Sequence, residues 1–347
     1  SPNHLNEEFR QALFRHSRGH ALFTVELLRD LQERGDLLQD AHGHWIEGPM
    51  LSWETLPARI EGIIEKRVNH LAPELREALT VASVEGERFT AEVVARVQAI
   101  DERWLIRRFS TELEKRHHLV RALDVRHLGS QRFSRYRFRH SLFQQYLYNQ
   151  LDDVERAMLH EEVGNVLETL YQNQPDEISS VAGQLAWHFQ EAGIAAKAIG
   201  YRYQAGQGAV RLSANQEAIE HFVQGLSLLS TLPNAQDRVQ QELALRVALA
   251  VPVTAVHGYT SNEAEQEYAR AWELCNQVGD TPQLFPALYG LWRYYLLRAD
   301  LTRSRTLVNQ LMDLAQTAGD RGLLVEAERA FGVYLFHAGE LVSAREH

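Results

Sequence analysis

The chain has 347 residues, of which 45% are apolar, and its formal net charge is −10. At about 150 residues per domain, this length predicts two or three domains, each with enough apolar residues for a core. The single cysteine, Cys275, excludes a disulfide framework and a cysteine-built zinc site, and it favours a reducing compartment, the cytoplasm.

The chain carries no clear membrane or export signal. Its longest nearly unbroken apolar stretch, Ala248 to Val256, is far shorter than the roughly 20 residues that cross a bilayer. The first residues are polar and acidic, without an initiator methionine, and the last ones stop inside a helical pattern. We therefore expect a piece of a longer protein and no membrane contact.

Helical periodicity dominates, with apolar residues three and four apart in nearly every window. Two helices are predicted between Phe9 and Leu38, separated at Ser17-Arg-Gly19, and a loop or short hairpin is predicted from Asp40 to Trp53. Leu56-Pro57 opens the next helix, because proline is tolerated at an early helical position. The fold class is therefore predicted to be mainly α.

Residues 72 to 160 differ from this pattern. Three predicted helices, Pro73 to Val84, Thr90 to Ala99 and Asp101 to His117, precede two β-type runs. The runs are His118 to Leu123 and Phe133 to Phe138, split by a Gly129-Ser130 turn. Three helices and a β-hairpin predict a winged helix, whose third helix stands where a DNA-reading helix would lie.

That region is also basic. Residues 102 to 141 carry a charge of +7 in a chain that is otherwise acidic. The third predicted helix supplies a candidate basic face, formed by Arg103, Arg107, Arg108, Lys115 and Arg116. Such an island fits either a nucleic-acid or phosphate contact, or a solvated face that docks within the protein.

Catalytic and metal signatures are missing from the sequence. None of the three lysines, Lys66, Lys115 and Lys197, follows a glycine, so a Walker A phosphate loop is impossible here. His16 and His20 are four residues apart but Gly19 interrupts the helix, and His42, His44, His117 and His118 lack a metalloprotease frame. We expect neither an enzyme nor a metal site within this chain.

Beyond about residue 176 the sequence repeats. A shift of 40 residues superposes Gly279 on Gly319, and the same shift aligns Leu284 with Leu324, Ala287 with Ala327, Tyr294 with Tyr334, Leu301 with Leu341 and Arg305 with Arg345. Small residues recur twelve apart, Gly206 with Ala218 and Gly332 with Ala344. This pattern predicts an α-solenoid of tetratricopeptide-like (TPR-like) helical hairpins, in which each unit buries its apolar face against a neighbour. The aromatic residues Trp187, Phe189, Tyr201, Tyr203, Trp292, Tyr294 and Tyr295 are at helical spacing and are interpreted as core rather than as a ligand site.

Several segments resemble a known family. Arg18-Gly-His-Ala-Leu-Phe-Thr-Val-Glu-Leu-Leu28 resembles the lid region of STAND ATPases, signal-transducing AAA-like proteins. Leu56-Pro-Ala-Arg-Ile60, Leu71-Ala-Pro-Glu-Leu75 and Tyr136-Arg-Phe-Arg-His-Ser-Leu142 with Tyr146 resemble the winged-helix segments of that family. Gly258-Tyr259, the run from 267 to 275 and Gly279-Asp-Thr-Pro-Gln-Leu-Phe285 resemble the repeats of bacterial class III adenylate/guanylate cyclases and related ATPases.

The resemblance implies a domain order and candidate nucleotide contacts. It implies a helical lid at 1–71, a winged helix at 72–175 and a TPR-like solenoid at 176–347. In the family the lid packs on adenine and a winged-helix histidine reaches the ADP phosphate, which corresponds here to Gly19-His20-Ala21 and to Arg139 with His140. Ala21 stands where the family has proline, and Ser141 where it has aspartate. The other interpretation of Arg139 and His140 is that they merely begin a helix after the wing.

The resemblance further implies a regulatory arm of a multidomain ATPase, whose repeats bind a protein or small ligand that relieves repression. The partner in the same protein is a nucleotide-binding core upstream of Ser1, which would bind ATP or ADP with Mg²⁺ and could be fused to a cyclase or kinase output. No cofactor is expected in this chain itself. The alternative is a DNA-binding regulator that uses the basic face, although the net charge of −10 opposes binding to a duplex.

Overall fold

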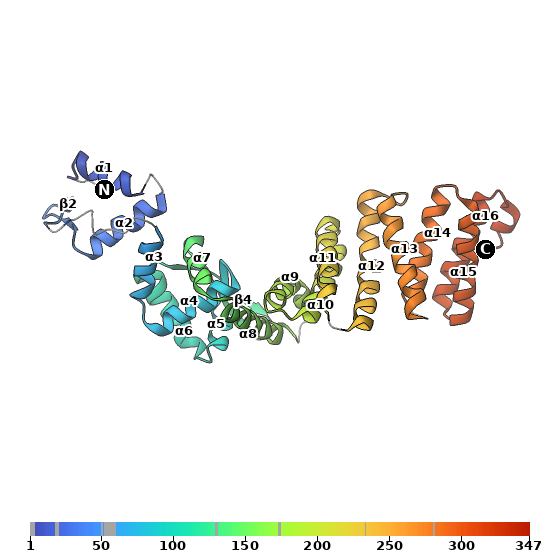
Figure 1. The fold of residues 1–347 in the computed structure, drawn as a ribbon, viewed down its shortest axis with the longest axis horizontal. Helices are drawn as coiled ribbons and strands as arrows, with labels where there is room; N and C mark the ends of the chain where they lie inside the picture. Colours follow the sequence, from blue (N-terminus) through green and yellow to red (C-terminus); the bar gives the residue numbers. More distant parts are fainter. Residues whose placement is uncertain are drawn as a thin grey trace. The chain divides into compact units, whose positions relative to one another are not determined.

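The computed structural model describes residues 4–17, 21–49, 51, 60–128, 131–172, 175–232, 234–279 and 282–347. The chain forms two compact units, Ser1–Arg156 and Ala157–His347. Helices dominate both units (Figure 1), which confirms the mainly α class with an arm of helical hairpins. The divisions expected at 71/72 and 175/176 stay predictions.

The first unit begins with a small helical subdomain. Its elements are α1 (Glu7–Ser17), α2 (Ala21–Glu33), β1 (Leu37–Gln39), β2 (Trp45–Glu47) and α3 (Ile60–Asn69). The strands pair antiparallel, so the hairpin alternative for the loop after Asp40 is the observed one. Phe9, Phe23, Leu27 and Leu31 are buried together in its core. The Leu56-Pro57 helix start lies outside the described residues.

A second group of elements completes this unit. They are α4 (Pro73–Glu85), β3 (Arg88–Thr90), α5 (Ala91–Val97), α6 (Glu102–Arg108), the π-helix η2 (Phe109–Arg116), β4 (Val120–Leu128), β5 (Gln131–Phe138) and α7 (Ser141–Gln150). The predicted β-hairpin is present and longer than expected, and its turn at 129–130 lies outside the described residues. A third strand, β3, pairs with β5 and was not predicted, because three residues are too few for an alternating pattern.

An aromatic cluster joins the helices to this sheet. Phe89 on β3 packs edge-to-face on Phe109 of η2, with ring centroids 5.7 Å apart, and Tyr136 and Phe138 of β5 surround them. All four rings are 3% exposed or less. Edge-to-face and offset contacts of this kind stabilise a core beyond the buried area alone. The cluster holds α6 and η2 against the sheet.

The second unit is a stack of helices. They are α8 (Asp153–Tyr171), α9 (Pro175–Glu191), α10 (Ala195–Arg211), α11 (Asn215–Leu228), the 3₁₀ turn η3 (Leu229–Thr231), α12 (Ala235–His257), α13 (Asn262–Val278), α14 (Leu284–Leu297), α15 (Leu301–Ala318), α16 (Arg321–His337) and α17 (Leu341–Ala344). From α9 on, each helix packs on the next. In addition α10 contacts α12 and α14 contacts α16, so alternate helices form one layer of the stack.

The 40-residue register predicted from the sequence is present in this stack. Gly279 and Gly319 each end a helix, at φ values of 97° and 64° that favour glycine. Ala287 and Ala327 are both fully buried at equivalent positions of α14 and α16. The small residue Gly206 allows close packing, because a Cβ there would lie 2.5 Å from the ring of Phe222.

Helix α12 is, among the described residues, the one that is long and apolar enough to cross a membrane by length and composition. The apolar stretch Ala248 to Val256 covers only part of α12, because polar residues interrupt the rest of the helix at intervals. Its buried side chains include Leu243, Leu245, Leu249 and Val253. These side chains pack between α11 and α13, so packing within the solenoid accounts for the apolar residues of α12.

Candidate ligand-binding groove in the helical repeats

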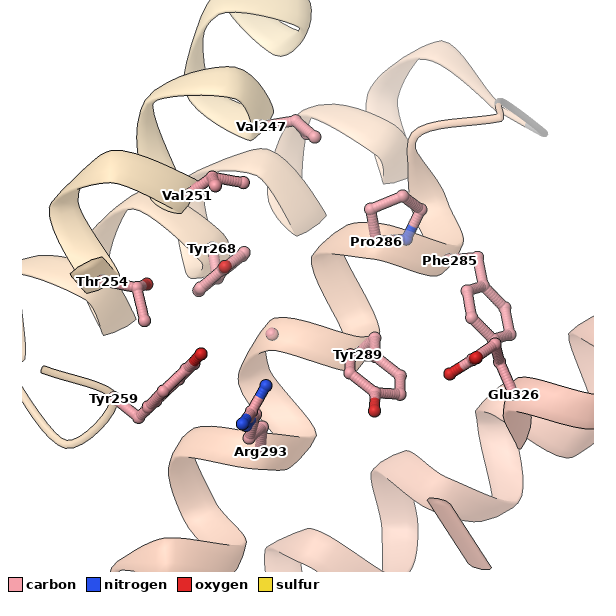
Figure 2. Close-up of a pocket in the computed structure, with 11 residues that line it drawn as sticks. Val247, Val251, Thr254, Tyr259, Tyr268, Phe285, Pro286, Tyr289, Arg293 and Glu326 are labelled. Atoms are coloured by element: carbon pink, nitrogen blue, oxygen red, sulfur yellow. The ribbon is translucent and has the colours of Figure 1, made fainter. Parts of the chain in front are cut away.

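A pocket of about 300 Å³ opens between α12, α13, α14 and α16 (Figure 2). Its lining residues are Val247, Val251, Thr254, Tyr259, Tyr268, Phe285, Pro286, Tyr289, Gly290, Arg293 and Glu326. Most of these are aliphatic or aromatic, with a few polar groups converging among them. This composition is typical of sites that bind small molecules or side chains of a partner.

The pocket continues along the solenoid. A second hollow of about 390 Å³ lies between α10, α11 and α12 and shares Val247 and Val251 with the first. We call the two hollows together the α12 groove. Val251 is 52% exposed at the shared wall, which is unusual for a valine in a helix with buried neighbours on both sides. The lining of the two hollows therefore extends from α10 to α16 and is mainly apolar.

Arg293 supplies the positive charge of the first pocket of the α12 groove, and Arg211 lines the second hollow. The guanidinium carbon of Arg293 lies 3.7 Å from the centroid of the Tyr259 ring, and the side chain is half-buried. Within the described part of the chain it forms no ion pair. The carboxylate of Glu326, by contrast, is 2.6 Å from the guanidinium of Arg329, which also donates to the Tyr289 hydroxyl. The charge of Glu326 is thus compensated and that of Arg293 is available to a ligand.

Tyr268 forms the floor of the same pocket. Burial raises the pKa of its phenol above the usual value, and its side chain is hydrogen-bonded with that of Thr254. The ring lies against Gly290, where a Cβ would overlap it. The phenol of Tyr268 therefore stays neutral at physiological pH. The absence of a side chain at Gly290 leaves room for the Tyr268 ring.

The aromatic residues interpreted as core from the sequence mostly lie in the core. Phe189, Tyr201, Trp292 and Tyr294 are 0% to 8% exposed. Trp187, Tyr203 and Tyr295 are only half-buried, and Tyr203 lines the second hollow of the α12 groove. Tyr259 and Tyr268 were noted in the sequence only within segments that resemble the family's repeats, and Tyr289 was not noted, because their convergence depends on how the helices pack.

The structure locates part of the predicted nucleotide-contact set. Gly19 and His20 lie outside the described residues, and Ala21 is the exposed first residue of α2. Arg139 and His140 are exposed just before α7, where the Arg139 Nε donates to the carbonyl of Val120 at 3.4 Å. His140 is the residue before the helix and its side chain makes no capping bond. A nucleotide role for these residues stays a prediction.

The five residues of the predicted basic face are all exposed on α6 and η2. Arg108 is paired with Glu112 and lies 5.4 Å from the Trp104 ring. Arg103 and Arg107 line a hollow of about 600 Å³ between α5, α6 and β5. Arg96 and Arg132, which were not predicted from the sequence as part of the basic face, line it as well. Lys115 and Arg116 do not line this hollow. Two carboxylates, Glu92 and Glu102, share it and reduce its net charge.

Comparisons with known proteins give limited likenesses. No family model matches the chain. An uncharacterized protein of Rhizobium meliloti (strain 1021) is 26% identical over 159 residues, which are 45% of this chain and 15% of that protein. A Signal Transduction ATPase with Numerous Domains (STAND) protein with a tetratricopeptide repeat sensor, from Pyrococcus horikoshii, aligns in its crystal structure with 98% of this chain at 10% identity and a TM-score of 0.38. The alignment covers 55% of the P. horikoshii chain. The chain thus spans about half of that protein and a small fraction of the R. meliloti one.

Proposed function

We propose that this chain is the regulatory and sensor arm of a cytoplasmic multidomain signalling ATPase, with the α12 groove as its sensing surface. The observation that carries the proposal is a mainly apolar groove in a helical-repeat unit, lined also by two arginines, Arg293 and Arg211, that form no ion pair among the described residues. Helical repeats use such surfaces to bind partners. A partner that binds one arrangement of the arm better than another shifts its population by that difference in affinity.

The groove chemistry defines the class of ligand. Val247 and Val251 offer a surface for an aliphatic or aromatic side chain. Arg293 offers a charge-assisted hydrogen bond to a carboxylate or phosphate, and the hydroxyl groups of Tyr268 and Tyr289 offer further polar contacts. We infer a peptide segment with an apolar anchor next to an acidic residue.

A random peptide library displayed on phage tests this directly. We expect the chain to enrich peptides that combine a large apolar residue with a nearby Asp or Glu. Val251→Glu, which places a charge in the shared wall, should abolish the enrichment. Val325→Glu is the matched control, because Val325 is 65% exposed on α16 and does not line the groove. Equal enrichment by both variants, or no enrichment by the unmodified chain, would refute the groove as the sensing surface.

The first unit would connect the sensor to the nucleotide core. In this proposal its subdomain around α1 to α3 corresponds to the lid, and α4 to β5 to a winged helix. The support is the element order α4, β3, α5, α6–η2, β4 and β5, in which the three strands form one antiparallel sheet. ATP or ADP with Mg²⁺ would bind outside these residues, and His140 would meet the phosphate from the start of α7. In this proposal the chain itself is not an enzyme.

A DNA-binding regulator is the second candidate. It is favoured by the exposure of Arg103 and Arg107 beside Arg132 of the hairpin, which resembles the helix-and-wing contact surface of DNA-binding winged helices. Binding through several phosphate contacts should weaken steeply, by roughly three orders of magnitude, between 50 and 200 mM salt. No detectable binding to duplex DNA at 50 mM salt would eliminate this function.

A further inference from the structure

A cluster of two imidazoles and one carboxylate lies at the turn of the β1–β2 hairpin. Asp40 and His44 flank the turn, and His4 joins them from the segment before α1. One potential ligand atom from each residue lies within 4.8 Å of the other two. The fold brings His4 to residues that are 36 and 40 positions away, so the sequence shows only the Asp40/His44 pair.

Backbone hydrogen bonds hold the three residues in place. The His4 amide donates to the carbonyl of Trp45 at 3.0 Å, which ties the N-terminal segment to β2. Asp40 Oδ1 accepts the backbone N–H groups of His42 and His44 at 2.8 and 2.9 Å. The other oxygen, Oδ2, faces His44 Nδ1 at 3.5 Å. One carboxylate oxygen thus organises the turn and the second remains for a ligand.

The geometry of the imidazole nitrogen suits a cation. His44 Nδ1 is shielded from water, and its contact with Asp40 Oδ2 at 3.5 Å is longer than an ordinary hydrogen bond. The rings of His4 and His44 meet edge-to-face, with centroids 4.4 Å apart. A shielded nitrogen beside a carboxylate and a second imidazole is an arrangement that a metal ion would satisfy.

We propose that His4, Asp40 and His44 bind one divalent transition-metal ion, with Zn²⁺ as the best fit. Two nitrogens and one oxygen match the ligand preference of Zn²⁺ and its neighbours in the series, whereas Ca²⁺ and Mg²⁺ prefer oxygen alone. Zn–N bonds of about 2.0 Å put two ligands of one ion no more than about 4 Å apart. Closing the cluster requires a small rotation of the exposed His4 side chain. Water would complete the coordination, and the ion would fasten the N-terminal segment to the hairpin.

Calorimetric titration of the 347-residue chain with Zn²⁺ tests the site. We expect one ion per chain, and we expect His4→Ala, His44→Ala and Asp40→Asn each to weaken binding by about tenfold to a hundredfold, at least what the loss of a supporting partner costs. Asp40→Asn is informative because its amide oxygen still accepts the two backbone N–H groups of the turn while the anionic ligand is lost. His337→Ala is the matched control, since His337 is exposed on α16, and it should bind Zn²⁺ as the unmodified chain does.

Co²⁺ gives an independent readout. Bound Co²⁺ should show visible ligand-field absorption, and added Zn²⁺ should displace the Co²⁺ and abolish that absorption. The proposal is wrong if the chain binds no Zn²⁺ at millimolar concentration. It is equally wrong if the three variants bind as tightly as the His337→Ala control, because the ion would then lie elsewhere.

Discussion

The guanidinium carbon of Arg293 lies 3.7 Å from the centroid of the Tyr259 ring, so that a residue of α14 contacts the turn between α12 and α13. The contact is a cation–π pair, which fixes the cation without neutralising it. Figure 2 shows both side chains among the residues that line the pocket, with Tyr268 and Tyr289 close by. The pair therefore presents a positive charge at a set position in a groove that is lined mainly by apolar side chains.

Loss of this charge should weaken binding of acidic peptides. For a peptide selected on the unmodified chain, Arg293→Gln should reduce affinity by on the order of tenfold to a hundredfold, the equivalent of one hydrogen bond to a charged group. Arg321→Gln, at an exposed arginine of α16 outside the groove, should change it little. Fluorescence anisotropy with a labelled peptide measures both. Equal losses in the two variants would show that net charge, rather than the groove, attracts the peptide.

Two glycines of α10 allow a matched test of repeat packing. A Cβ at Gly206 would lie 2.5 Å from the Phe222 ring, so Gly206→Ala should lower the free energy of unfolding by about 1 to 3 kcal/mol through overpacking. Gly208 has its nearest neighbour at 3.8 Å, so Gly208→Ala should be neutral or add up to about 1 kcal/mol through helix propensity. Urea denaturation of the two variants and of the unmodified chain measures both changes in the free energy of unfolding. The same effect from both would mean that α10 and α11 do not pack as closely as described.

Glu85 makes the stability of the first unit depend on pH. Its carboxylate is buried and accepts the backbone N–H of Thr90 at 2.9 Å, and burial raises its pKa from 4.5 to about 8. The folded state thus holds the proton more tightly than the unfolded state does. The stabilisation is complete below about pH 4.5 and is lost as the pH rises to about 8.

Glu85→Gln stays neutral and keeps an acceptor for Thr90, so it should unfold at a higher urea concentration than the unmodified chain at pH 8 and at a similar one at pH 5. The exposed Glu87 supplies the control, because Glu87→Gln should have little effect at either pH. A Glu85→Gln effect that is the same at both pH values would contradict a buried, protonated carboxyl.

The chain alone should bind ADP with a dissociation constant in the millimolar range or weaker. Phosphate-loop amides and a lysine on the β/γ-phosphates supply most nucleotide affinity, and a chain without a Gly-Lys pair lacks that loop. Charge-assisted bonds of about 1.5 to 3 kcal/mol each from Gly19, His20 and His140 would barely offset the roughly 4 kcal/mol or more lost on association. Isothermal titration with ADP and Mg²⁺ measures this dissociation constant. A micromolar value would reveal a complete nucleotide site within these residues.

The solenoid was largely predictable from sequence, whereas the sites were not. Burial of Ala287 and Ala327 at equivalent positions follows from a repeat in which every unit packs on the next, and such periodicity is local information. The α12 groove depends on which exposed residues of α12, α14 and α16 converge after packing, and no spacing along the chain encodes that. The cluster of His4, Asp40 and His44 could not be predicted from the sequence for the same reason, because His4 lies far from the other two residues along the chain.

The central claim is that the repeats restrain a nucleotide core until a partner binds. Its most direct test is the ATP hydrolysis rate of the whole natural protein, measured with and without residues 176–347. We expect removal of the repeats to raise the basal rate about fivefold or more, the lower range of typical coupling between sites. An unchanged rate would contradict repression by this arm.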